Sequence, residues 1–311
     1  MSAASPARAV RAAAPLLPLA AALGLTATAA PCAAAETPPA LLPEAIAEAY
    51  SAAMQGRKAE TLDAVGRAAA AVPLARVLAA GDSGWMLTPR YAALVRFGLW
   101  DEMIAVLPPV LPPDRRAPGL TAGYLYARGV ALAARGRLEE ARRTLGDLEA
   151  LTATVPADTM AGHDRLREVL AIAAPVVAAR IAASEAHPRE AIRLLEQAVA
   201  AEERLAYDGP ADWFFPAGDL LGAQLLESGE AAQAERVYRR DLERHPGNGW
   251  ALYGLAAALR AQGRTAAAAA AAREFAAAWR RADVQLGASA FWFAGPDRTR
   301  CECERRSSGE R

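Results

Sequence analysis

The sequence is poor in the residues that β-structure favours. Aromatic residues make up only 6% of its 311 residues, and β-branched residues are also scarce. Alanine, which has the highest helix propensity, is heavily used instead. Hydrophobic residues reach 53%, which is enough for a sizeable core. The composition therefore predicts an all-α fold, built as one or two ordinary domains or as one elongated repeat array.

The chain also lacks an excess of charge of either sign. Its 35 basic residues balance 35 acidic residues, so no global basic field attracts nucleic acid. Lys58 is the only lysine, and a bias toward GC-rich codons explains the use of arginine as well as a need for guanidinium groups does. We therefore expect no nucleic-acid partner.

Cysteine is scarce as well, with three residues in the whole chain. Cys301 and Cys303 lie two positions apart in a polar tail, where a disulfide would close a small, strained ring. A metal site would need more ligands nearby than this tail contains. We expect no metal and no structural role for these two cysteines.

Common catalytic motifs are absent. No P-loop, GxGxxG, HExxH or GxSxG pattern occurs. His163 and Asp164 are neighbours, but adjacent residues of a helix face different ways. His187 and His245 each precede a proline at a predicted helix boundary. We therefore expect no catalytic residues, no cofactor and no enzyme activity, although residues distant in sequence could still assemble a site.

The N-terminus has the features of a signal peptide over residues 1–35. Arg8 and Arg11 form a positive region without acidic residues, and an apolar stretch follows to about Ala30. Small residues then precede Glu36, the expected start of the mature chain, whose net charge would be −2. Two prolines and few leucines argue against a retained membrane-spanning helix. We predict an exported protein, located in the periplasm if the cell has one.

Cys32 leaves a second possibility, which is a lipoprotein anchored through this cysteine. The residues before it are Ala29, Ala30 and Pro31, whereas lipoproteins resemble Leu-Ala-Gly-Cys at this point. The anchor is therefore the less favoured alternative. In either case we expect contact with a membrane only through the signal peptide or this lipid.

Helical segments recur along the mature chain. Gly229 and Gly263 are 34 residues apart, which is the tetratricopeptide period. Around Gly229, the pair Leu221-Gly222, the small residue Ala234 and the closing Pro246 stand at the positions of that repeat. A side chain larger than alanine would push the two helices of a unit apart. A glycine tolerates the left-handed backbone that ends the first helix.

Three units carry this register clearly, at about residues 122–155, 215–248 and 249–282. The first contains Gly129, Gly136 and Ala141, and the last contains Gly263 and Ala268. Weaker units surround Gly98, Ala186 and Gly56. We expect an irregular array of helix pairs over residues 36–292, followed by a disordered tail over 293–311. Within the array, Asp212 is a predicted helix N-cap that precedes the aromatic run at 213–215.

These segments resemble the tetratricopeptide family, and the stretch from about Trp85 to Trp279 is similar to a group of bacterial exported members of unknown activity. The resemblance implies a right-handed superhelix of antiparallel helix pairs, and it implies no catalytic residue. It also implies a concave groove that contacts a partner. The groove positions are Tyr126, Arg180, Asp219, Trp250, Tyr253 and Arg260.

A scaffold that binds a protein or peptide through this groove is the expected function, because aromatic and arginine side chains suit peptide contacts. Trp250 and Tyr253 could instead pack against the neighbouring repeat. Two other classes stay open. One is an accessory subunit or enzyme with a site between repeats, and the other is a structural lipoprotein of the cell envelope.

Overall fold

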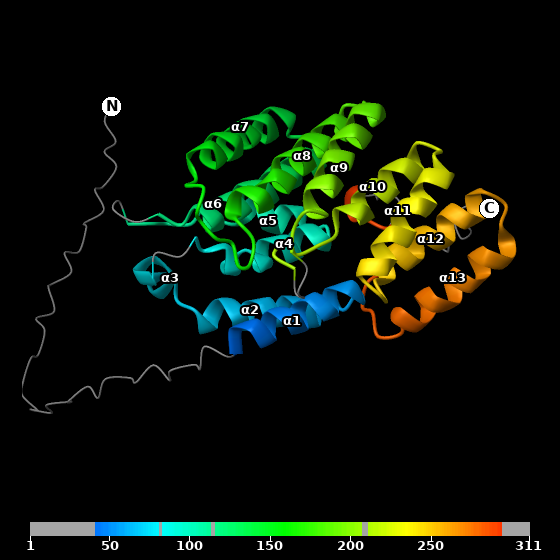
Figure 1. Ribbon diagram of the computed structural model, residues 1–311, viewed down its shortest axis with the longest axis horizontal. Helices are drawn as coiled ribbons and strands as arrows, with labels where there is room; N and C mark the ends of the chain where they lie inside the picture. Colours follow the sequence, from blue (N-terminus) through cyan, green and yellow to red (C-terminus); the bar gives the residue numbers. More distant parts are fainter. Residues whose placement is uncertain (1–40, 81–82, 113–115, 207–210, 294–311) are drawn as a thin grey trace, which may run out of the picture. The chain divides into compact units, whose positions relative to one another are not determined.

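The computed structural model describes residues 41–80, 83–112, 116–206 and 211–293. Within these ranges the chain forms thirteen α-helices and two short 3-10 helices (Figure 1), and an isolated bridge between Met160 and Arg165 is the only β-type pairing. The predicted all-α fold is confirmed for this part of the chain. The elements are α1 (Leu41–Met54), α2 (Lys58–Ala71), α3 (Leu74–Ala80), η1 (Trp85–Leu87), α4 (Pro89–Arg96), α5 (Trp100–Ala105), α6 (Pro118–Ala134), α7 (Leu138–Thr154), α8 (Leu166–Ser184), α9 (Pro188–Glu202), α10 (Ala217–Glu227), α11 (Ala231–Arg244), α12 (Gly249–Ala261), α13 (Thr265–Ala278) and η2 (Phe291–Phe293).

Six tight turns join consecutive helices into pairs, and each turn holds one residue with a left-handed backbone. In this conformation the chain reverses while a backbone N–H still bonds a carbonyl of the last helical turn. Arg137 N, for example, donates to Leu132 O at 2.9 Å. In these six turns the residues with positive φ are Gly56, Gly98, Gly136, Ala186, Gly229 and Gly263, with values between 59° and 80°.

The pairs stack through a repeating set of neighbours. We call the first helix of each pair after η1 a leading helix (α4, α6, α8, α10 and α12) and the second a trailing helix (α5, α7, α9, α11 and α13). Each of the first four trailing helices packs on its own leading helix and on the leading helix of the next pair. The leading helices also contact one another, as α4 does with α6, α6 with α8 and α10 with α12.

Small residues let the helices of this array approach closely. A Cβ added to Gly222 would lie 2.3 Å from Cζ of Tyr238, and one added to Gly254 would lie 2.2 Å from the same atom. The Tyr238 ring therefore fills the space between α10 and α12. A Cβ on Gly129 would lie 2.8 Å from Cγ1 of Val177 on α8. The expected small positions of the trailing helices are buried as well: Ala141, Ala234 and Ala268. Pro246 lies exposed in the turn between α11 and α12.

The first helix pair is joined directly to the loop that follows the last one. The Asp283 carboxylate accepts hydrogen bonds from Lys58 N at 2.5 Å and Ala59 N at 2.8 Å, and Asp283 N donates to Gly56 O at 3.1 Å. The indole ring of Trp279 lies against Gly56, where a Cβ would come within 2.2 Å. The carboxylate thus caps the N-terminus of α2, whose first N–H groups have no partner within the helix.

Asp212 does not have its predicted role, because α10 begins at Ala217 with Pro216 before it. The Asp212 carboxylate instead accepts a hydrogen bond from Asp164 N at 2.7 Å, and its carbonyl accepts one from Trp85 Nε1 at 2.7 Å. Asp212 therefore ties two loops together. The aromatic run that follows it packs inward, as the stacking of Trp213 on Trp85 shows.

Several sequence predictions fall outside the described residues. These are the signal peptide over 1–35, Cys32, the mature start at Glu36, both tail cysteines and nearly all of the predicted tail. Among the helices that are described, none is both long enough and apolar enough to cross a bilayer.

Candidate functional site

The predicted groove residues of the leading helices are largely covered. Trp250 and Asp219 have no exposed surface, and Tyr126 retains only 9%. Asp219 and Trp250 therefore cannot form part of an open groove, and this part of the prediction is wrong. Tyr253 is half-buried against Phe275 of α13, at 5.4 Å between ring centroids, and Arg260 is exposed. Arg180 is partly exposed on α8.

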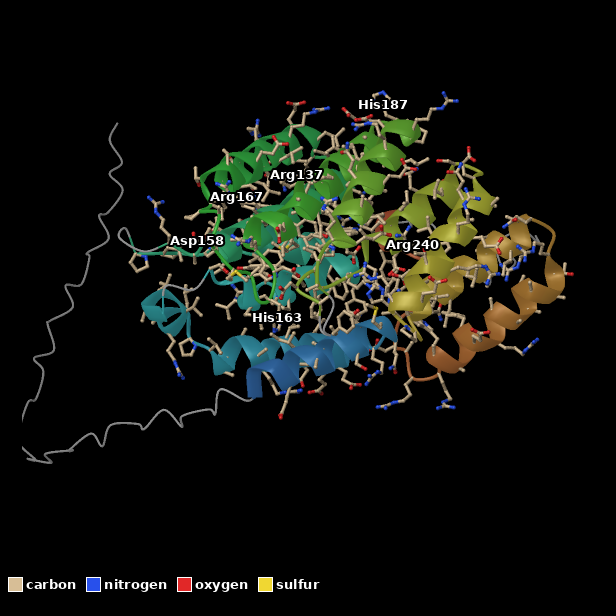
Figure 2. All side chains as sticks on the ribbon, viewed as in Figure 1. Arg137, Asp158, His163, Arg167, His187 and Arg240 are labelled. Carbon is tan, nitrogen blue, oxygen red and sulfur yellow. The ribbon has the colours of Figure 1, made fainter. Side chains whose placement is uncertain are left out.

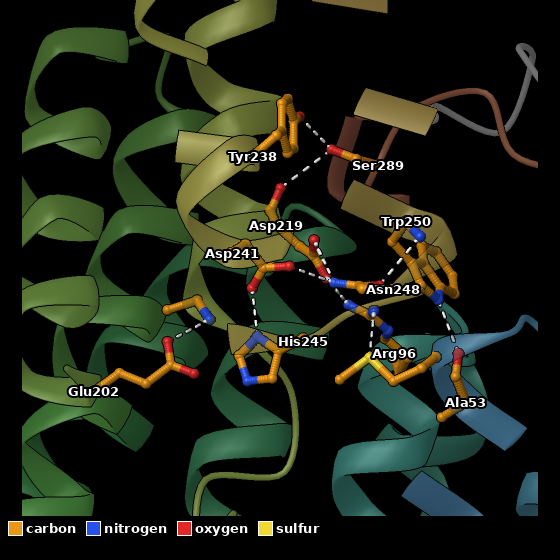
Figure 3. Close-up of polar contacts among 12 residues, drawn as sticks. Ala53, Arg96, Glu202, Asp219, Tyr238, Asp241, His245, Asn248, Trp250 and Ser289 are labelled. Carbon is orange, nitrogen blue, oxygen red and sulfur yellow. Dashed lines mark hydrogen bonds and ion pairs between the residues drawn. The ribbon is translucent and has the colours of Figure 1, made fainter. Parts of the chain in front are cut away.

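Residues 284–293, which we call the C-terminal segment, lie over part of this surface and contact Trp250 and Asp219. Ser289 is the polar anchor of this segment. Its hydroxyl donates to the main-chain carbonyl of Asp219 at 3.2 Å and lies 2.5 Å from the Tyr238 hydroxyl (Figure 3). Ser289 and Ala290 are both buried. The segment is thus fixed to α10 and α11.

Aromatic side chains of the same segment contact two further helices, α12 and α8. Phe291 packs edge-on against Trp250 of α12, with centroids 5.5 Å apart, and its Cβ lies 3.0 Å from where a Cβ of Gly98 would be. Trp292 is buried, and the guanidinium of Arg180 on α8 lies 5.8 Å from its ring. Four of the six predicted groove residues, namely Tyr126, Arg180, Asp219 and Trp250, therefore surround this segment or lie directly beneath it.

Arg96, at the end of α4, links the aromatic residues to a buried acid. Its guanidinium lies 4.1 Å from the centroid of the Trp250 ring and 4.9 Å from that of Phe215. A terminal nitrogen pairs with the Asp219 carboxylate at 2.8 Å, and both side chains are almost fully buried. Burial raises the pKa of Asp219, while the positive charge of Arg96 opposes that rise.

A chain of polar contacts continues from Asp219 to the turn before α12 (Figure 3). The Asn248 amide nitrogen donates to the carboxylates of Asp219 at 3.1 Å and Asp241 at 2.7 Å, while its oxygen caps α12 by accepting from Trp250 N. Asp241 also bonds Nδ1 of His245 at 2.8 Å. Burial alone would lower the pKa of His245, but the hydrogen bond and charge of Asp241, together with the charges of Glu202 and Asp219, raise it overall.

Glu202, the last residue of α9, lies near Asp241 and His245. One of its carboxylate oxygens accepts a hydrogen bond from Ala217 N at 2.8 Å. The surrounding protein atoms, with a smaller contribution from the charge of Asp241, raise the pKa of Glu202 to about 8. The raised pKa favours the protonated carboxyl to a higher pH than in a free glutamate, while the hydrogen bond from Ala217 and the nearby cations favour the ionised form.

The histidines do not form a cluster. His163 and His187 lie far apart (Figure 2), and His245 belongs to the turn that follows α11. Asp164, the neighbour of His163, accepts from Ala206 N at 3.0 Å. In the part of the chain that the structure describes, no group of three or more His, Cys, Asp or Glu side chains is arranged to hold a metal ion.

Sequence reasoning missed Arg96, Asp241 and Asn248 as members of a common network. Asn248 had a usable signal, since it follows a His-Pro-Gly turn directly before a predicted helix. The C-terminal segment had one too, because Phe291-Trp292-Phe293 is an aromatic run in a chain with few aromatics. The position of Arg96 beside Asp219 had none, because the two residues are 123 positions apart.

Comparison with known proteins adds no assignment, since no protein-family model and no curated protein matches the chain.

Proposed function

We propose that the protein is an exported tetratricopeptide-like scaffold that binds a short segment of a partner protein along its leading helices. One observation carries the proposal. The C-terminal segment already lies on these helices, held by the bond from Ser289 to a main-chain carbonyl and by aromatic contacts of Phe291 and Trp292. Hydrogen bonds to the main chain of the binding protein, combined with contacts of neighbouring side chains, are a common way to hold a short peptide.

The arrangement of helices supports the tetratricopeptide-like part of this proposal. Paired helices, left-handed turn residues and trailing helices that contact the next pair are all expected of such an array. The features of residues 1–35 support export, with release into the periplasm as the favoured outcome.

The buried state of the groove defines what a partner has to do. A partner segment would replace the C-terminal segment rather than occupy an empty surface, because Trp250 and Asp219 are covered. The partner would then resemble what it displaces, with small residues followed by neighbouring aromatics. The free energy of partner binding is the difference between the contacts that the partner makes and those that the C-terminal segment loses. A variant whose own segment is held less firmly should therefore bind partners more tightly.

A peptide-exchange experiment tests this. A fluorescein-labelled peptide with the sequence of residues 284–293 is titrated against the full chain and against a Phe291→Ala/Trp292→Ala double variant, with binding followed by fluorescence anisotropy. We expect at least tenfold tighter binding to the double variant. Phe275→Ala is the matched control, since it removes an aromatic residue outside the segment and should leave the affinity unchanged.

Two results would contradict the proposal. One is a double variant that keeps its helical circular dichroism and thermal transition but does not bind the peptide. The other is binding of a scrambled peptide with the same affinity as the 284–293 peptide, because that would show non-specific binding to an apolar surface.

A further inference from the structure

A pocket of about 400 Å³ lies between two trailing helices, α9 and α11. Gly218 and Leu221 of α10 line it as well, and no residue of the C-terminal segment does. This volume falls within the range of pockets that hold small molecules. The pocket is therefore a separate feature from the surface that holds the C-terminal segment.

Three arginines line the pocket from the α11 side. Arg236, Arg240 and Arg244 are spaced four residues apart, so they share one face of the helix and span about 12 Å along it. Arg240, labelled in Figure 2, pairs with Glu203, the residue directly after α9, at 2.6 Å. Guanidinium groups match carboxylates through two parallel hydrogen bonds, which makes this row suited to an anionic group.

The interior of the pocket is apolar. Val199 of α9, Leu221 of α10 and Val237 of α11 line it. Gly218 leaves additional space, because a Cβ added there would meet nothing closer than 3.7 Å. An aliphatic body fits these walls, since burying its surface is favourable by roughly 25 cal/mol per Å².

Glu202, Asp241 and His245 also line the pocket. Glu202 shares its surroundings with Asp241, His245 and Arg244, and the remaining charged groups of the lining are Glu196, Glu203, Arg236 and Arg240. When Glu202 is protonated it adds a hydrogen-bond donor in place of a negative charge. The polar lining then consists of the donors Arg236, Arg240, Arg244 and Glu202 and the acids Glu196, Glu203 and Asp241, with His245 beside Asp241.

We infer that this pocket binds a small organic acid with an aliphatic body, whose carboxylate bonds the arginine row of α11 while its chain contacts Val199, Leu221 and Val237. The inference goes beyond the proposed peptide binding and uses none of the residues that hold the C-terminal segment. The lining also contains the carboxyl groups of Glu196, Glu203 and Asp241, which an alkyl amine would pair with instead, so comparing an acid with an amine of the same chain length tests whether the arginine row sets the preference.

Octanoate is the probe, titrated into the full chain by isothermal calorimetry at pH 7. We expect saturable binding, at least tenfold weaker in an Arg236→Ala/Arg240→Ala double variant. Arg239→Ala is the matched control, because Arg239 is on α11 but pairs with Glu235 outside this pocket, and the affinity should not change. Gly218→Ala should also weaken binding at least fivefold while the thermal transition stays in place, because the added methyl occupies pocket volume without a clash.

The pH profile tests the part assigned to Glu202. Octanoate affinity should fall as the pH passes about 8, where this carboxyl ionises, and should not fall there in Glu202→Gln. Equal binding of octanol or octylamine would overturn the inference. So would undiminished binding in the folded double arginine variant, or the absence of saturable binding to the wild-type chain.

Discussion

Replacing Arg96 by methionine is the most direct test of how the array is held together. The substitution keeps an unbranched side chain but removes the cation that pairs with Asp219 at 2.8 Å. The side chains of Arg96 and Asp219 are 4% and 0% exposed, so water cannot take the place of the lost partner. We therefore expect a large loss of stability.

The magnitude follows from the burial of the pair. Removing one partner of a buried ion pair costs about 3–5 kcal/mol, and the lost contacts of the guanidinium with Trp250 and Phe215 add to that cost. Methionine recovers part of it through packing, so we estimate about 4 kcal/mol. A natural domain has about 5–15 kcal/mol in total. Arg96→Met should therefore remain folded, but with little of its free energy of unfolding left.

Urea denaturation followed by circular dichroism measures this, for Arg96→Met, Asp219→Asn and the double variant. The double variant should be about 2 kcal/mol more stable than the sum of the single losses predicts, because it leaves no unpaired buried charge. Arg193→Met, which breaks an exposed pair with Glu190, is the matched control and should cost at most about 1 kcal/mol.

The pH dependence gives an independent check. Burial raises the pKa of Asp219, and the loss of Arg96 should raise it further. An acid whose pKa is raised by folding stabilises the fold below its ordinary pKa and loses that contribution as the pH rises. The deficit of Arg96→Met should thus be largest near pH 8 and smallest near pH 4. A loss below 1 kcal/mol, or a deficit that grows toward low pH, would refute the reasoning.

Two further predictions concern Glu202 and Asp283. The raised pKa of Glu202 means that the wild-type chain should lose stability between pH 4.5 and 8, and Glu202→Gln should flatten this slope in thermal melts; an unchanged slope would contradict the assignment. Asp283→Asn weakens the cap of α2 and should cost about 0.5–2 kcal/mol, with faster hydrogen exchange at Lys58 and Ala59. Unchanged exchange at those two amides would show that the cap has no energetic weight.

The sequence was informative wherever the structure depends on local signals. Gly229 and Gly263 lie at turns because a left-handed residue is needed to end a helix, and that requirement is visible in the chain itself. Ala234 and Gly222 are small because helices cross there, which a repeat period reveals. The N-cap predicted for Asp212 from its neighbours in sequence was wrong, because its carboxylate accepts a hydrogen bond from Asp164 N instead.

Contacts between distant parts of the chain could not be predicted in the same way. Trp250 stands at a predicted groove position, yet its indole N–H donates to Ala53 O at 2.8 Å, nearly 200 residues earlier. No period in the sequence indicates that the first helix pair and the C-terminal segment would cover this side chain. The burial of Trp250 and Asp219 therefore could not be predicted from the repeat pattern.

The bond between Asp283 and α2 bears on how the protein unfolds. In an open repeat array each unit contacts only its neighbours, so the terminal units fray first and the array melts in stages. Here the terminal pairs support each other, and neither can detach without the other losing contacts. We therefore expect the chain to unfold more cooperatively than an open array, and to fold more slowly because these contacts join residues more than 220 positions apart.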